Sequence, residues 1–209
     1  MKYKNIIWSV LLLNIMGCNN QTKISTKYLN DSTMSLNNTI ELKVSSKQEK
    51  IEVSSYIVKG DTLWVVSGDQ FLYYPLGVHK TIGELSTIFP FMNKKQLLNN
   101  DVVLNNLYFN RSSIVTVLDM NDSGNIEVVY VKISDSDIAL VNGIKVGLNK
   151  SEFMNYLSIS LQKSEWDKIN IVILESELLG VWNYYYFSSN ILDSILFKTD
   201  YQYDLSNMK

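Results

Sequence analysis

Short runs of alternating apolar and polar residues dominate the chain from residue 39 onward and predict a strand-rich protein. The runs are rich in β-branched and aromatic residues and are separated by Gly, Asn and Asp, as is typical of strands joined by turns. The predicted strands cover residues 39–44, 51–58, 62–66, 70–74, 102–109, 113–118, 126–132, 138–141, 144–146, 169–174, 181–187 and 191–197. The first four follow one another closely and predict an antiparallel meander. An Asn142-Gly143 pair predicts a type I′ hairpin turn between two later strands.

Two segments depart from the strand pattern and predict short amphipathic helices. Thr81 and Glu84 have the spacing of a capping box, in which two side chains accept hydrogen bonds from backbone amides of the first turn. Apolar residues then recur at helical spacing until Pro90 ends the run. Asn149 and Glu152 repeat the capping pattern before a second set of apolar residues.

The order of hairpin, capped helix and three strands occurs twice along the chain. The shift that places Thr81 on Asn149 also places Glu84 on Glu152. The sequence therefore predicts an α+β fold, with antiparallel sheets each packed by a short helix, arranged as two tandem modules after an N-terminal β-meander. The alternative is two unrelated α+β passes that share common capping and turn chemistry.

Composition divides the chain into four predicted parts. Residues 1–17 combine a positively charged start with an apolar run, the pattern of a signal peptide. Residues 18–38 are rich in Asn, Ser and Thr and predict a flexible tether. The meander and the first helix–sheet module occupy residues 39–135, and the second module occupies residues 136–209.

Gly17 and Cys18 close the apolar run of the predicted signal peptide, and Cys18 is the only cysteine. This segment resembles a bacterial lipoprotein signal, in which the cysteine that follows a small residue is lipidated and becomes the new N-terminus. The resemblance implies a protein anchored in the membrane of the bacterial cell envelope through lipidated Cys18. Asn19, where an Asp would favour the inner membrane, implies the outer membrane. The alternative is an ordinary cleaved secretory signal, which leaves Cys18 as a free thiol.

The segment from Ile144 to Phe153 is an apolar strand followed by Gly147 and a capped helix. It resembles the start of the helix-plus-sheet module in small envelope lipoproteins of the outer-membrane assembly type. The tandem order is similar to the β-lactamase inhibitory protein fold, in which two such modules form a curved sheet. Both resemblances imply a protein-binding module without catalysis.

Charge and residue chemistry narrow the function classes. The formal net charge is −2 and Arg111 is the only arginine, so the sequence predicts no nucleic-acid-binding face. His79 is the only histidine, and no nucleophile motif or metal-ligand spacing accompanies it, so we expect no catalytic residue, metal or cofactor. The run from Asp119 begins like a calcium loop but has Tyr130 where a bidentate Glu is needed, which favours a hairpin turn.

Residues 181–187 carry aromatic side chains on both faces of a predicted strand. The strand period of two places Trp182, Tyr184 and Tyr186 together on one face. Because a helix covers only one face of a sheet, these three residues predict an aromatic platform for a protein partner. The alternative is a core under both faces.

We therefore expect a non-enzymatic lipoprotein, held at the membrane by Cys18, that binds a protein partner in the envelope. A carbohydrate- or lipid-binding envelope protein is the second hypothesis, and it requires a deep pocket with converging polar groups. An envelope hydrolase is the third, and it requires His79 within hydrogen-bonding distance of a carboxylate and a hydroxyl.

Overall fold

The computed structural model describes residues 50–99, 102–118, 125–178, 180–201 and 203, with the backbone alone at 97–99. These residues belong to one compact unit. The predicted signal peptide at 1–17, the tether at 18–38 and the strand at 39–44 lie outside the described residues.

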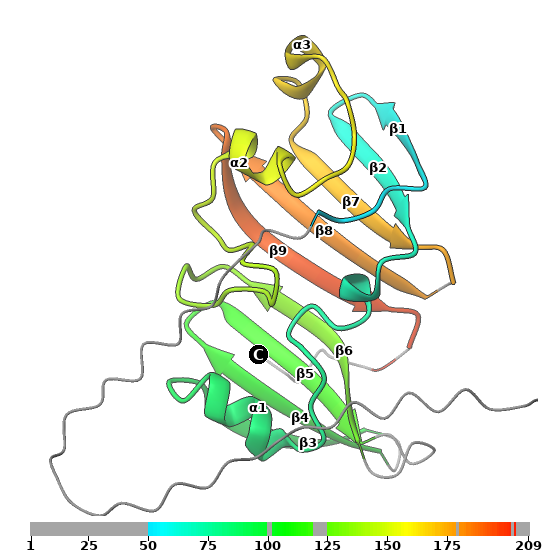
Figure 1. Cartoon of the computed structure of the whole chain (residues 1–209). Coiled ribbons are helices and arrows are strands. Elements are labelled where there is room, and N and C mark those ends of the chain that lie inside the picture. Colours follow the sequence, from blue (N-terminus) through cyan, green and yellow to red (C-terminus); the bar gives the residue numbers. More distant parts are fainter. Residues whose placement is uncertain (1–49, 100–101, 119–124, 179, 202, 204–209) are drawn as a thin grey trace, which may run out of the picture. The chain divides into compact units, whose positions relative to one another are not determined.

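Nine strands of the described chain form a single mixed sheet (Figure 1). They are β1 (Ser55–Lys59), β2 (Thr62–Ser67), β3 (Asn93–Asn99), β4 (Val102–Phe109), β5 (Ser112–Leu118), β6 (Ile126–Ile133), β7 (Ile171–Ser176), β8 (Val181–Ser188) and β9 (Ile191–Thr199). Their order across the sheet is β1-β2-β7-β8-β9-β6-β5-β4-β3. β2 and β7 are parallel, and the other neighbouring strands are antiparallel.

The predicted α+β fold, with two tandem modules that each hold a separate helix-packed antiparallel sheet, is wrong. β6 pairs edge to edge with β9, so the strands assigned to the two modules belong to one predominantly β structure. The hairpin of β1 and β2 joins the same sheet beside β7 and does not form a separate meander. These pairings join segments far apart in the chain, and the residue pattern along one strand does not specify its neighbour.

Several local predictions also fail. Residues 138–141 and 144–146 form no strands and pair only through an isolated bridge between Ala139 and Lys145. Residues 70–74 were expected to form a strand, but Gln70–Leu72 is a short 3₁₀ helix, η1. The Asp69 side chain caps it by accepting a hydrogen bond from the Phe71 amide at 2.9 Å. Strand β3 has a polar sequence that predicts no strand, and it is held by backbone pairing with β4 at the sheet edge.

The type I′ turn lies in a different hairpin from the one predicted. Gly143 has a φ of 88°, but Asn142 is not among the residues with positive φ, so the prediction of a type I′ turn there is wrong. In the β8–β9 hairpin, Ser189 and Asn190 have φ values of 50° and 65°. A type I′ turn requires positive φ at both central positions, and this pair satisfies the requirement without glycine.

Three short α-helices are present in the described chain: α1 (Ile82–Ile88), α2 (Lys150–Met154) and α3 (Lys163–Trp166). Both predicted N-caps are confirmed. The Thr81 hydroxyl accepts a hydrogen bond from the Glu84 amide at 3.1 Å, and Asn149 with Glu152 forms a capping box. α2 ends earlier than its apolar pattern predicts, and α3 was not predicted.

Removing the N-cap of α1 should lower the free energy of unfolding by a small, measurable amount. Thr81→Ala is expected to lower the free energy of unfolding by about 1 kcal/mol, because the Glu84 amide loses its acceptor. Urea unfolding measures the change. Thr87→Ala is the control, since Thr87 lies within the helix and its hydroxyl donates to the Gly83 carbonyl of the preceding turn. An equal loss in both variants would contradict a capping role.

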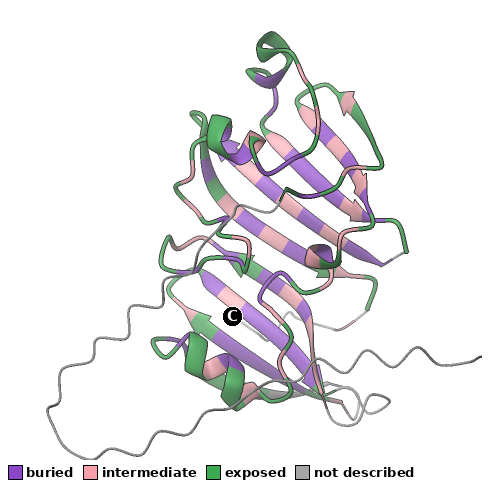
Figure 2. Ribbon diagram, in the orientation of Figure 1, coloured by how far each residue is buried: buried purple, intermediate pink, exposed green. Residues whose placement is uncertain are grey.

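The main core lies on one face of the sheet, here called the helix-covered face. Phe153 of α2 is fully buried, with its ring centroid 4.8 Å from that of Tyr185 and 5.2 Å from that of Phe187. Leu85 of α1 is buried in the same apolar cluster. Figure 2 shows the resulting alternation of buried and more exposed residues along β8 and most of β9. The other side is here called the opposite face.

The pH dependence of the free energy of unfolding tests the burial of Tyr185 on the helix-covered face. Its side chain is fully buried, and its hydroxyl has no hydrogen-bond partner among the described residues. Burial raises the pKa of Tyr185 well above its usual value. Above about pH 10 the unfolded chain therefore loses this proton while the folded chain keeps it, so stability falls as pH rises.

Tyr185→Phe is expected to raise the free energy of unfolding by about 1 kcal/mol at neutral pH, because it removes an unpaired buried hydroxyl. The advantage of the variant should then grow by about 1.4 kcal/mol for each pH unit above 10. Urea unfolding of both proteins at pH 8 and pH 11 measures it. A constant difference across this range would show that Tyr185 ionises while folded.

Candidate partner-binding surface

Strand register brings apolar and aromatic side chains from four strands into one row on the opposite face. Trp64, Ile173, Tyr184 and Leu196 are successive partners across β2, β7, β8 and β9. Side chains at directly paired positions lie close enough to touch, so the row is continuous. Of these four, only Tyr184 was expected from the sequence. Period two within β2 and β7 also marks a second apolar face, whereas β9 places Ser194 and Lys198 on either side of Leu196 and carries no such signal.

Strand β8 supplies the centre of this surface. Trp182, Tyr184 and Tyr186 are half-buried, whereas the four alternate residues on the helix-covered face are at most 8% exposed. The three predicted platform residues therefore lie together on the less buried side of the strand. We name Trp64, Trp182, Tyr184 and Tyr186 the aromatic face.

The tyrosines of the aromatic face are ordered by ring contacts. Tyr184 and Tyr186 stack with centroids 6.3 Å apart and an interplanar angle of 8°. The Lys198 ammonium lies 5.8 Å from the Tyr184 ring centroid, within reach of a cation–π interaction. Burial, with smaller contributions from Tyr186 and Glu175, raises the pKa of Tyr184, and burial raises that of Tyr186. Both phenols are therefore protonated at neutral pH and can donate hydrogen bonds.

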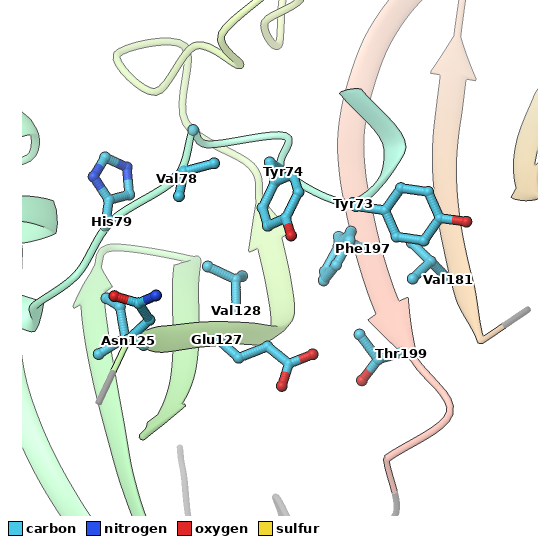
Figure 3. Close-up of a pocket in the computed structure, with 12 residues that line it drawn as sticks. Tyr73, Tyr74, Val78, His79, Asn125, Glu127, Val128, Val181, Phe197 and Thr199 are labelled. Carbon is cyan, nitrogen blue, oxygen red and sulfur yellow. The ribbon is translucent and has the colours of Figure 1, made fainter. Parts of the chain in front are cut away.

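His79 lies in a separate small pocket of about 170 Å³ (Figure 3). Its Nε2 donates to the carbonyl oxygen of Leu76 at 2.7 Å. Glu127 lines the same pocket, and in Figure 3 its carboxylate points away from the His79 ring, toward Thr199. This bond lies within the loop that precedes α1.

The structure brings none of the remaining candidates that it describes together into one site. Cys18 and the start of the calcium-like run at Asp119 lie outside the described residues. Asp135 accepts hydrogen bonds from the side chains of Asn110 and Ser112, which ties it to the β4–β5 turn. Among the described residues, no three His, Cys, Asp or Glu side chains are grouped as metal ligands.

No helix in the described ranges combines the length and the apolar character needed to cross a bilayer.

No protein-family model, curated protein or solved structure matches this chain. Its function must therefore be inferred from the fold and from the chemistry of its surfaces.

Proposed function

We propose that the protein is a lipid-anchored lipoprotein of the bacterial cell envelope that binds a protein partner, without catalysis, through the aromatic face. The observation that carries the proposal is the gathering of Trp64, Trp182, Tyr184 and Tyr186 on the side of the sheet that α1 and α2 do not cover. Trp and Tyr dominate the binding energy of protein interfaces, because they bury a large area and keep a polar group for hydrogen bonding.

The dimensions of the row support a protein partner. From Trp64 to Leu196 the row crosses three strand spacings, roughly 14 Å at about 4.8 Å each. Glu175 and Lys198 flank Trp182 on the neighbouring strands and add charges of both signs beside the aromatic rings. An apolar centre with polar groups at its edge is the usual anatomy of a protein interface.

Photo-crosslinking tests the proposed surface. A benzophenone amino acid in place of Tyr184 should give a discrete adduct in the envelope fraction of the source organism. The same group in place of Glu84, which is exposed on α1, serves as the control for random collision. An adduct at position 84 and none at position 184 would place the partner on the wrong side of the sheet for this proposal.

The anchor is tested separately by Cys18→Ala. Stable attachment through lipid requires more than one acyl chain, and Cys18 is the only residue proposed to carry them. The variant is therefore expected to move from the membrane pellet to the soluble fraction, as followed by immunoblot. If Cys18→Ala stays in the pellet after a high-salt wash, the anchor proposal is contradicted.

A further inference from the structure

A cleft of about 590 Å³ lies on the opposite face of the sheet, over β3 to β6. The cleft lies next to the row that ends at Leu196, because Lys132 on β6 is the register partner of Leu196 on β9. The cleft and the aromatic face are nevertheless built by different strands. The cleft can therefore have a ligand of its own.

The floor of the cleft is buried and its rim is charged. Asn106 and Val115 are each 1% exposed and form part of the floor. The Ser113 hydroxyl donates to the Asn106 side-chain oxygen at 2.7 Å, which fixes the orientation of that amide. Arg111 and Lys132 are exposed at the rim.

Positive charge predominates in the cleft, although the whole chain has a formal charge of −2. Lys95 joins Arg111 and Lys132 in the lining, and no Asp or Glu lines the cleft in the part of the chain that the structure describes. The carboxylate beside the cleft, Asp135, is engaged by the Ser112 hydroxyl and the Asn110 amide. It offsets part of the Arg111 charge and leaves the Lys132 side of the cleft cationic.

Two tyrosines complete the lining. Tyr108 and Tyr130, from β4 and β6, line the cleft as well. Burial, and to a lesser degree Tyr186, raises the pKa of Tyr130, so its hydroxyl remains a donor at neutral pH. The volume lies within the range of small-molecule sites, and guanidinium, ammonium, hydroxyl and amide groups are the donors that bind carboxylate and phosphate oxygens.

We propose that this cleft binds a small organic anion that carries carboxylate or phosphate groups. Arg111 supplies a planar pair of donors that suits either oxyanion, and Lys132 supplies a second positive charge on the adjacent strand. The proposal is independent of the protein-binding role of the aromatic face.

Isothermal titration calorimetry of the full chain in detergent, at constant ionic strength, tests it with citrate and pyrophosphate as probes. One-site binding with a Kd of about 1 mM or tighter is expected for at least one probe. Binding of citrate alone identifies a carboxylate ligand, and binding of pyrophosphate alone identifies a phosphate ligand. Binding of both identifies a site that recognises negative charge in either group.

Lys132→Glu and Arg111→Gln are each expected to weaken binding by about tenfold or more. Lys59→Glu is the matched control, since Lys59 is exposed on β1, the strand at the other edge of the sheet. It should change the affinity by less than about twofold. If neither probe binds, or if Lys59→Glu weakens binding as much as Lys132→Glu does, the proposed site is overturned.

Discussion

Replacing Phe153 with alanine is expected to lower the free energy of unfolding by about 4 kcal/mol. Phe153 is the residue of α2 that enters the core, with no exposed surface and with both Tyr185 and Phe187 in ring contact. Alanine would remove the ring and leave a cavity between the helix and β8. A loss of this size is a large fraction of the stability of an ordinary domain.

Urea unfolding of the purified protein measures the loss, and Phe91→Ala provides the matched control. Phe91 is 39% exposed and contacts Phe89 and Phe109 near the surface, so its removal should cost about 1–1.5 kcal/mol. Similar losses in the two variants would contradict the assignment of Phe153 to the core of the helix-covered face. The same result would remove the reason for calling the other side a binding surface.

Replacing Trp182 with alanine is expected to weaken partner binding by about 30-fold or more, equivalent to about 2 kcal/mol. Trp182 lies on the aromatic face between Glu175 and Lys198, where its indole can be buried by a partner. Because the side chain is already half-exposed, its loss should cost less folding stability than the loss of Phe153. The expected signature is thus a large change in affinity with a small change in stability.

The partner identified by crosslinking at position 184, titrated against immobilised wild type and variants, supplies the measurement. Tyr74→Ala is the control, since Tyr74 is 44% exposed but lies outside the aromatic face. It should change the affinity by less than about twofold. If Trp182→Ala binds as tightly as wild type, or if Tyr74→Ala binds as weakly as Trp182→Ala, the aromatic face is not the interface.

Many strand positions could be predicted because they depend on the local residue pattern, although residues 70–74, 138–141 and 144–146 form no strands. The predicted strands at 102–109, 113–118 and 181–187 fall on β4, β5 and β8 within one residue at each end. Capping could be predicted at Thr81 and Asn149 for the same reason, since a capping box is local chemistry. Strand β3, with its polar sequence, has no such local signal.

Sheet assembly could not be predicted, because it depends on contacts between distant segments. The parallel pairing of β2 with β7 places Trp64 beside Ile173, and the local sequence around either residue does not identify its partner. In β8 the strand period of two places Trp182, Tyr184 and Tyr186 on one face. Which of the two faces a helix covers depends on where Phe153 packs. The cleft escaped prediction altogether, since Arg111 and Lys132 belong to different strands and turns.

The most direct test of the binding surface is hydroxyl-radical footprinting of the protein, purified and in its native envelope. In the purified protein, Trp182 and Tyr184 should be modified and the buried Tyr185 should not. In the envelope, we expect Trp182 and Tyr184 to be protected while the exposed Tyr74 remains reactive. Equal modification of Trp182 and Tyr184 in the two settings would contradict the account, because an occupied interface cannot stay open to solvent.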